Sequence, residues 1–354
     1  MAVCLSSWYY KGTSINSPFI SYTIEKIYRN SFERQFIEVP ISCMKLISFI
    51  IPAYNVAPYL KACLDSVYAL DMGRYEREVI VINDGSTDQT EEVLRRYQSE
   101  HPDVICLTQS NQGPSVARNQ GIAVATGKYI SFVDADDTLD VQGASLFPFE
   151  RLESESIDLV GVSLRLVTDN GLKPYRRYVS PFGKVFSPAR EFLKGRNLIP
   201  CPGAYLYKRE FLNTSGVRFH EGILHEDEEW APMCFLLADS FVALDVNFYC
   251  RYYRSESITT TTNKSRQELK IRNMLTVIQT LDGYLKEHED ACPYLQFKMD
   301  YLCVDLIRLL HRQHHRKEFR METVQILRDL GYFPLRPHPE LKYKLFSLLT
   351  RCIY

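Results

Sequence analysis

The chain has 354 residues, of which 45% are hydrophobic and 24% charged, and these proportions exclude disordered, collagen-like and small disulfide-built proteins. Its 42 Lys and Arg residues nearly balance 43 Asp and Glu residues, so it lacks the basic excess on which nonspecific nucleic-acid binding depends. Ten scattered cysteines form no C-x-x-C pair, and no apolar run approaches the roughly 18 residues of a spanning helix. We therefore expect a cytoplasmic protein with reduced thiols and no nucleic-acid partner.

Residues 1–44 show neither helical nor strand periodicity, and an abrupt strand pattern begins at Leu46. We expect this segment to be a poorly ordered N-terminal extension. Because Met44 stands directly before the first strand pattern, we interpret it as a candidate start, with residues 1–43 outside the native protein.

Strand and helix patterns alternate four times between Leu46 and Val133. Ser86 and Gln89 form a capping-box pattern for one helix, and Pro114 suits the first turn of another. Near-continuous apolar strands separated by helices predict a mainly parallel sheet covered on both faces, which is the doubly wound, Rossmann-like α/β class. The four strand patterns are residues 46–52, 78–83, 104–108 and 129–133.

The second half of the chain carries mixed signals and then helices. Strand patterns at residues 157–166, 204–207 and 241–249 precede helical periodicity from about residue 263, including a helix from Pro339. We therefore expect a catalytic domain over residues 45–262 and a C-terminal helical region over residues 263–354. Residues 301–354 carry ten basic and five acidic side chains. These helices either contact anionic lipid at the inner face of the membrane or cap the catalytic domain with their charges in water.

Polar residues follow the predicted strands at the sheet edge where doubly wound sheets bind ligands. Asp134, Asp136 and Asp137 cluster after the fourth strand, where a cation would offset their mutual repulsion. Mg²⁺ takes one or two protein carboxylates together with substrate phosphate oxygens, which suits such a sparse set. An ordinary acidic turn is the alternative. The other strand ends read Pro52-Ala53-Tyr54-Asn55 and Asn83-Asp84-Gly85-Ser86.

These motifs, in their order along the chain, resemble the family 2 glycosyltransferases of the GT-A fold. The resemblance covers about residues 45–262. It implies an α/β GT-A-type sheet followed by the C-terminal helical extension. The matching segments are residues 50–55, 84–88, 111–113 with 117–119, 134–137, Glu221-Gly222 with Glu226-Asp227, and 253–259.

The resemblance implies a site for a nucleotide diphosphate-sugar donor, which we expect to be a UDP-sugar. Ala53, Tyr54 and Asp84 would hold the base, Asp134 would contact the ribose or sugar, and Asp136 would bind Mg²⁺ or Mn²⁺, with Asp134 as the second candidate ligand. Core packing is the alternative for Tyr54, and a helix-surface position is the alternative for Arg118. The full expected donor-binding set is Pro52, Ala53, Tyr54, Asn55, Asp84, Asn111, Gly113, Arg118, Asp134, Ala135, Asp136 and Arg254.

The acidic run from Glu226 to Glu229 supplies carboxylates for the acceptor side. A carboxylate within hydrogen-bond reach of a hydroxyl can take its proton during attack. The resemblance assigns this base to Asp227, with Glu226 as the other candidate, while a solvated helix start is the ordinary explanation of an acidic run. Trp230 is either a wall for a sugar ring or a core residue. One base opposite one leaving group predicts a single displacement with inversion.

We therefore expect a metal-dependent, inverting glycosyltransferase of the hexosyltransferase type that transfers a sugar to a hydroxyl of a sugar or lipid-linked sugar acceptor. By resemblance, its setting is the synthesis of a cell-envelope polysaccharide or glycolipid. The processive polymerases of the family that this sequence resembles carry a Q-x-x-R-W motif and membrane helices. Neither occurs here, which favours one sugar per acceptor over chain extension. The alternatives are a catalytically inactive nucleotide-sugar binding module and a sugar-phosphate nucleotidyltransferase, which would need a Gly-rich loop where residues 51–55 stand.

Overall fold

The structure is a computed structural model that describes residues 22–24, 35–37, 45–168, 171–176, 181–194, 196, 198–253, 264–312 and 315–335. Two units divide the chain at Met44 and Lys45. In the first unit, β1 (Tyr22–Ile24) pairs with β2 (Gln35–Ile37) in antiparallel fashion. The expectations for the rest of residues 1–44 and for the helix from Pro339 lie outside the described residues.

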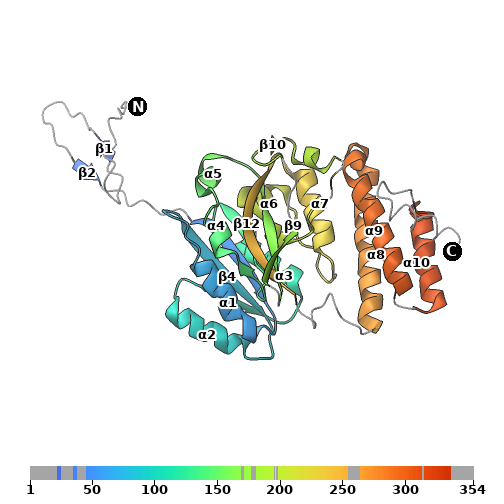
Figure 1. The fold of residues 1–354 in the computed structure, drawn as a ribbon, viewed down its shortest axis with the longest axis horizontal. Helices are drawn as coiled ribbons and strands as arrows, with labels where there is room; N and C mark the ends of the chain where they lie inside the picture. The colour runs from blue at the N-terminus through green and yellow to red at the C-terminus, as the bar shows by residue number, and fades with distance from the viewer. Residues whose placement is uncertain are drawn as a thin grey trace, which may run out of the picture. The chain divides into compact units, whose positions relative to one another are not determined.

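The first half of the second unit is the predicted parallel sheet (Figure 1). β3 pairs in parallel with both β4 and β6, and β4 pairs in parallel with β5. Because the chain passes from the edge strand β5 back across β3 to β6, right-handed crossovers place α3 on the face opposite α1 and α2. The doubly wound prediction is confirmed. The elements are β3 (Lys45–Ala53), α1 (Ala57–Tyr68), β4 (Glu76–Asp84), α2 (Thr90–Glu100), β5 (Ile105–Gln109), α3 (Pro114–Val124) and β6 (Tyr129–Phe132).

The second half of the sheet is mixed. Its strands extend the order to β10-β12-β8-β11-β6-β3-β4-β5, with β7 on β12 and β9 on β8. β11 is antiparallel to both β6 and β8, whereas β12 is parallel to β8. These elements are β7 (Thr138–Leu139), α4 (Val141–Ala144), α5 (Phe149–Ser154), β8 (Leu159–Thr168), β9 (Gly171–Arg176), β10 (Val185–Phe186), β11 (Tyr205–Lys208), α6 (Arg209–Ser215), α7 (Asp227–Leu237) and β12 (Phe241–Tyr252), with short 3₁₀ turns at Ala189–Leu193 and Pro202–Ala204.

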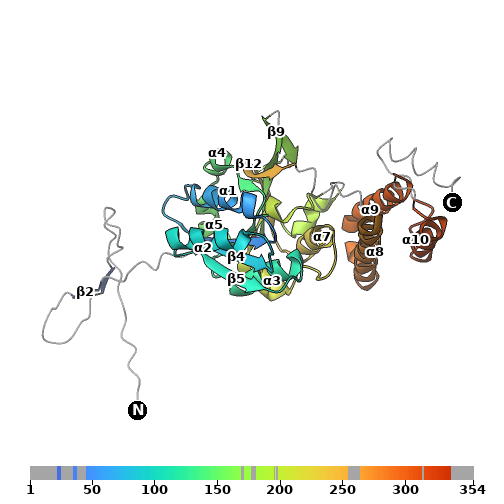
Figure 2. The same cartoon turned by 90° about the horizontal axis from the view of Figure 1, so that it is seen from below.

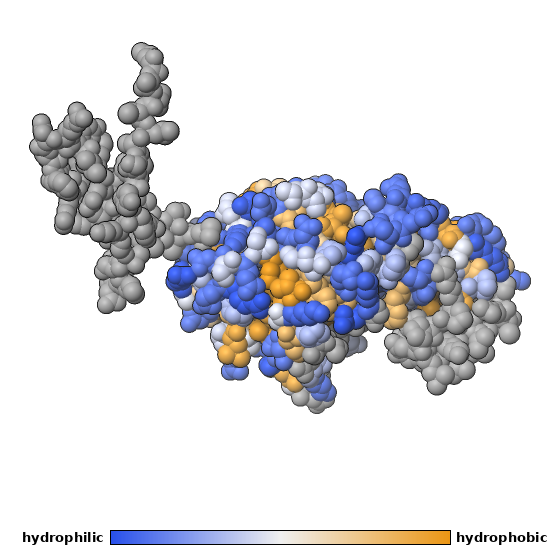
Figure 3. All heavy atoms as spheres, turned by 90° about the horizontal axis from the view of Figure 1, so that it is seen from above, coloured by the Kyte–Doolittle hydropathy of each residue, from blue (hydrophilic) through white to orange (hydrophobic). Residues whose placement is uncertain are grey.

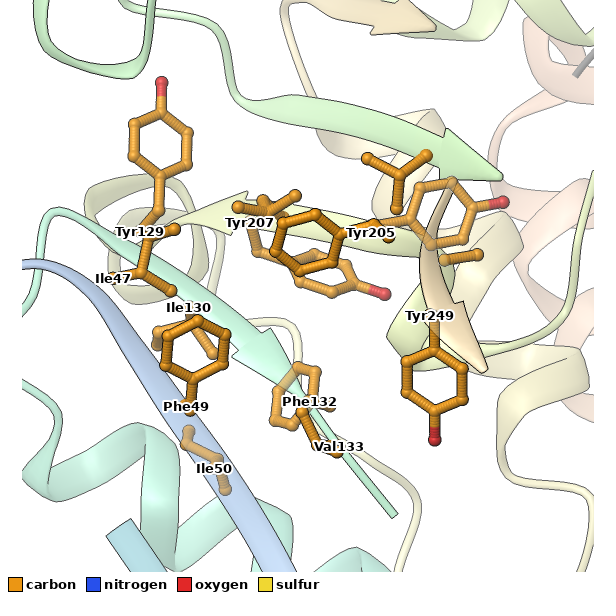
Figure 4. Packing of buried hydrophobic residues seen from close by; sticks show 14 of the residues in the cluster. Ile47, Phe49, Ile50, Tyr129, Ile130, Phe132, Val133, Tyr205, Tyr207 and Tyr249 are labelled. Atoms are coloured by element: carbon orange, nitrogen blue, oxygen red, sulfur yellow. The ribbon is translucent and has the colours of Figure 1, made fainter. Parts of the chain in front are cut away.

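The hydrophobic core lies against the central strands. Figure 4 shows Phe49 of β3, Phe132 of β6 and Tyr207 of β11 within this layer. All three side chains are fully buried. A Cβ on Gly121 of α3 would lie 2.3 Å from the Ile50 side chain, so a glycine there lets α3 pack closely on β3. The core thereby fixes the strands whose carboxyl ends carry the predicted ligand residues.

The C-terminal helices surround a second hydrophobic core, to which Leu236 of α7 also contributes. They are α8 (Lys264–Glu287), α9 (Cys292–Arg312) and α10 (Lys317–Asp329), with a 3₁₀ turn at Glu289–Ala291 (Figure 2). In the part of the chain that the structure describes, no helix combines the length and apolarity needed to cross a membrane. On the face drawn in Figure 3, hydrophilic side chains cover most of the coloured surface and hydrophobic ones gather in small patches.

The predicted capping box at Ser86 and Gln89 is wrong. Gln89 is the N-cap of α2 and makes no side-chain capping bond. Instead, Asp88 Oδ1 accepts a hydrogen bond from the Thr90 backbone N–H (2.9 Å), and Ser86 Oγ accepts one from the Asn55 N–H (3.1 Å). Ser86 thus joins two strand-end loops instead of starting a helix.

Glu78 of β4 is a buried carboxylate at the opposite end of the central strands from the predicted ligand residues. It accepts hydrogen bonds from Ser48 Oγ (2.6 Å), the Thr126 N–H (2.8 Å) and hydroxyl (2.6 Å), and Lys45 Nζ (2.9 Å). Burial alone would raise its pKa, but these bonds outweigh burial and hold the pKa of Glu78 at about 2. The ionised carboxylate therefore ties β3, β4 and the segment before β6 together.

Glu78→Gln should lower the free energy of unfolding by about 2 kcal/mol at pH 7, because hydrogen bonds to a charged group are lost. The wild-type protein should also lose stability as the pH falls from about 4.3, the ordinary value for Glu, towards 2, since protonation is then favoured in the unfolded chain. Urea unfolding of both proteins from pH 2 to 7 measures this, with exposed Glu76→Gln on the same strand as the control. Equal stability of the two variants at pH 7 would contradict the role given to Glu78.

Candidate active site

The carboxyl ends of four parallel strands meet at one edge of the sheet. Ala53 of β3 is in register with Asn83 of β4, and Asp84 is in register with Gln109 of β5. Residue 133 follows β6, which pairs with β3 on the other side. The sheet therefore brings the three expected motifs, at residues 52–55, 84–88 and 134–137, to a common edge.

Asp84 organises the loop between β5 and α3. Its Oδ1 accepts hydrogen bonds from Gln109 Nε2 (2.6 Å) and the Gln112 N–H (2.8 Å), and its Oδ2 accepts one from the Gly113 N–H (2.8 Å). These bonds fix the loop that carries Asn111 and Gly113, both expected donor-binding residues. A carboxylate oxygen has two lone pairs, so Oδ2 retains acceptor capacity for one further N–H.

The Asn55 side chain holds the segment after β3 against the loop after β4. This residue has a left-handed backbone, with φ of 52°, and its Oδ1 accepts a hydrogen bond from the Thr87 N–H (2.8 Å). Ala53 is buried and Pro52 is half-buried, whereas 47% of the Tyr54 surface is exposed. The core-packing alternative for Tyr54 is therefore wrong, and its ring is accessible at the edge where the base was expected.

The acidic motif after β6 is anchored by the end of β12. The Asp134 N–H donates to the Tyr249 hydroxyl (3.1 Å), which in turn donates to Asp137 Oδ2 (2.8 Å). Asp137 Oδ1 accepts a further bond from the Tyr252 N–H (2.8 Å). Burial, followed by the charges of Asp134 and Asp136, raises the pKa of Asp137 to about 7. Asp137 is thus a buried anchor, and Ala135 beside it is buried as well.

The two remaining carboxylates of this motif, Asp134 and Asp136, are partly exposed. Within the described ranges there is no group of three or more His, Cys, Asp or Glu side chains that could hold a metal ion by itself. A pair of carboxylates nevertheless fits Mg²⁺ or Mn²⁺, because Mg²⁺ takes its other ligands from phosphate oxygens and water. The charge crowding at Asp137 is what a divalent cation would relieve.

Arg118 of α3 connects the acidic motif to the acidic run expected on the acceptor side. Its Nη2 donates to Asp134 Oδ1 (2.8 Å) and its Nη1 donates to Glu226 Oε1 (2.7 Å). The guanidinium also lies over the Phe219 ring, 5.2 Å from the centroid. Burial lowers the pKa of Arg118, but the two carboxylates reverse this and raise it. Arg118 is only 5% exposed, so the helix-surface alternative for it is wrong.

The acidic run forms the first turn of α7, where carboxylates interact favourably with the helix dipole. Glu229 pairs with His220 Nδ1 (3.0 Å). Trp230 is buried, stacks on Phe219 with 3.8 Å between ring centroids, and donates from Nε1 to the Tyr207 hydroxyl (3.0 Å). Of the two interpretations of Trp230, the core residue is therefore the one that the structure supports.

Asp227 lies in this run between two carboxylates that are already paired. Arg118 holds Glu226, and Lys298 of α9 forms an ion pair with Glu228. Burial, followed by the charges of Glu228 and Glu226, raises the pKa of Asp227 well above its usual range, while Lys298 and Arg118 act in the opposite direction. Asp227 is thus a stronger proton acceptor than an ordinary exposed aspartate.

Two residues of this region were not expected from the sequence, Tyr249 and Lys298. Tyr249 lies near the end of an apolar strand, and nothing in the sequence indicates that its hydroxyl contacts Asp137, more than one hundred residues earlier. Lys298 could have been noticed as a lysine within the apolar face formed by Leu295, Met299 and Leu302. The expected residue Arg254 lies outside the described residues.

Known proteins resemble this chain in sequence and in fold. Residues 48–215 match the family model described as "Glycosyl transferase family 2". The uncharacterized glycosyltransferase YibD of Escherichia coli (strain K12) is 27% identical over 272 residues, which cover 75% of this chain and 78% of that protein. The poly(ribitol-phosphate) beta-glucosyltransferase of Bacillus spizizenii is 38% identical over 207 residues, covering 57% of this chain but only 32% of that protein.

A crystal structure of S. aureus TarS 1-349 in complex with UDP-GlcNAc shares the fold. Its TM-score is 0.54 at 18% identity, and the match covers 85% of this chain and 89% of that one. The family model ends before Glu226 and Asp227, so it does not cover the run expected on the acceptor side. The chain contains a family 2 glycosyltransferase domain, matched over residues 48–215, and its fold is of the GT-A type.

Proposed function

We propose that the chain transfers a sugar from a UDP-sugar to a hydroxyl of a sugar or lipid-linked sugar acceptor, with inversion at the anomeric carbon. The observation that carries this proposal is Arg118, because its one guanidinium contacts both Asp134 after β6 and Glu226 beside Asp227. A donor motif and a candidate base thereby lie on opposite sides of one buried cation. The complex of S. aureus TarS with UDP-GlcNAc supports the choice of a UDP-sugar.

Five of the expected donor residues have a direct role in this proposal. Tyr54 offers its exposed ring to the base, and Asp84 accepts an N–H of that base at Oδ2. Asp134 contacts the ribose or sugar, and Arg254 covers the diphosphate. Asp136, with Asp134, would hold Mg²⁺ or Mn²⁺, which when bound would offset the negative charge that develops on the leaving diphosphate.

Asp227 is the general base of the proposed reaction. It takes the proton of the acceptor hydroxyl while the hydroxyl oxygen bonds to the anomeric carbon and the bond from that carbon to the diphosphate oxygen breaks. Its raised pKa makes it a stronger proton acceptor than an exposed aspartate. A single displacement inverts the anomeric configuration and releases UDP.

The wider setting is the synthesis of a cell-envelope polysaccharide or glycolipid, with one sugar added per acceptor. The name of the Bacillus spizizenii relative, a poly(ribitol-phosphate) beta-glucosyltransferase, supports a cell-envelope polymer as acceptor. Residues 45–262 would form the catalytic domain, and the basic helices after residue 263 would place it at the inner face of the membrane.

Asp136→Ala should abolish metal-dependent binding of the donor, because a ligand of the proposed cation is lost. Calorimetric titration of UDP-glucose and UDP-GlcNAc in the presence of Mn²⁺ measures this, with exposed Asp71→Ala as the control. Unchanged binding by Asp136→Ala would remove Asp136 from the donor site. Failure of the folded wild type to bind any nucleotide sugar would contradict the proposed function itself.

Asp227→Asn should retain donor binding and lower kcat by about 10²- to 10⁴-fold, since the amide cannot accept the proton. Release of free UDP from the same donors measures turnover, and Asp329→Asn at the end of α10 serves as a matched control away from the site. Wild type that binds donor without ever releasing UDP would instead be the inactive binding module. Full turnover by Asp227→Asn would move the base to Glu226.

A further inference from the structure

A buried lysine of the C-terminal helical region contacts the acidic run. We propose that Lys298 of α9 is a positioning residue for the catalytic base, and that it acts through its ion pair with Glu228. The inference rests on the proposed function, because it assumes that Asp227 is that base. It makes the C-terminal helices part of the acceptor side of the site.

Lys298 is buried and has its charge paired across two helices. Its side chain is 4% exposed, and Nζ contacts Glu228 Oε2 at the start of α7. A charge removed from water is costly unless it is paired and hydrogen-bonded. Because the partner carboxylate directly follows Asp227 in the chain, this pair fixes the position of the first turn of α7 against α9.

Arg118 provides the matching contact on the other side of Asp227. Its side chain is 7% exposed and holds Glu226, the residue directly before Asp227. Asp227 therefore lies between two carboxylates, one held by the sheet domain through α3 and the other by the helical region through α9. Two contacts of this kind determine where the intervening carboxylate lies.

The backbone at His225 gives a separate sign that this turn is held in place. His225 has φ of 68°, a left-handed conformation that is unfavourable for a residue other than glycine. Such conformations persist where the surrounding structure over-determines them, and they cluster at functional sites. The strained residue stands immediately before the pair Glu226 and Asp227.

The charges that face Asp227 predict opposite effects for the two members of the pair. Glu226 and Glu228 of its own segment raise the pKa of Asp227, whereas Lys298 from α9 and Arg118 from α3 lower it. Lys270 of α8 and Asp305 of α9 act on the neighbouring His225. Removing the Lys298 charge should therefore raise the pKa of Asp227, and removing the Glu228 charge should lower it.

The test is the pH profile of kcat/KM for UDP release from UDP-GlcNAc or UDP-glucose with Mn²⁺ and water as acceptor. Water bonds to the anomeric carbon, UDP leaves and Asp227 takes the proton, so the acidic limb of the profile follows the base. Lys298→Met should move this limb to higher pH by about one unit, and Glu228→Gln should move it to lower pH. The double variant should lie near wild type, and Lys298→Arg should keep the wild-type profile.

Calorimetric donor binding should be unchanged in these variants, and exposed Lys286→Met on α8 should change neither readout. An unshifted acidic limb in both Lys298→Met and Glu228→Gln, in an active wild-type background, would overturn the positioning role and leave the proposed function standing. If Lys298→Met does not fold, the direction of the Glu228→Gln shift decides. A wild type that releases no UDP would instead contradict the proposed function.

Discussion

The arrangement of this site depends on the buried Arg118 guanidinium. A charge that is almost fully removed from water must be paired, and the partners here are Asp134 and Glu226. Glu226 lies more than one hundred residues after Arg118 in the chain. Because the guanidinium binds both carboxylates, it fixes the end of β6, the helix α3 and the start of α7 relative to one another. The proposed donor motif and the proposed base are therefore held near one another by an electrostatic requirement.

The rest of the molecule supports this pairing from several directions. β12 returns to the sheet so that the Tyr249 hydroxyl contacts both Asp134 and Asp137. Trp230 stacks on Phe219 and packs α7 against the aromatic core, next to the Arg118 guanidinium. The same core that stabilises the sheet thus sets the position of the acidic run.

Much of the first half of the fold could be predicted, because each buried strand is a continuous apolar run that ends in polar residues. The gathering of Asp84 and Asp134 at one edge follows directly from parallel strands. The capping box at Ser86 was wrong because a pattern of local spacing cannot reveal a distant partner, which here is the Asn55 N–H. The partners of Arg118 and Lys298 could not be predicted from the sequence for the same reason, since only tertiary packing decides with which carboxylate a helix cation pairs.

The central claim is that Arg118 couples the proposed donor and acceptor sides of the site through its two carboxylate partners. A double-mutant cycle on kcat/KM for UDP release tests this claim most directly. Asp134→Asn and Glu226→Gln are measured singly and together. Residues that share a partner should show an interaction free energy of about 0.5–3 kcal/mol, whereas independent sites add to within about 0.5 kcal/mol. The account predicts the former, and strict additivity would contradict it.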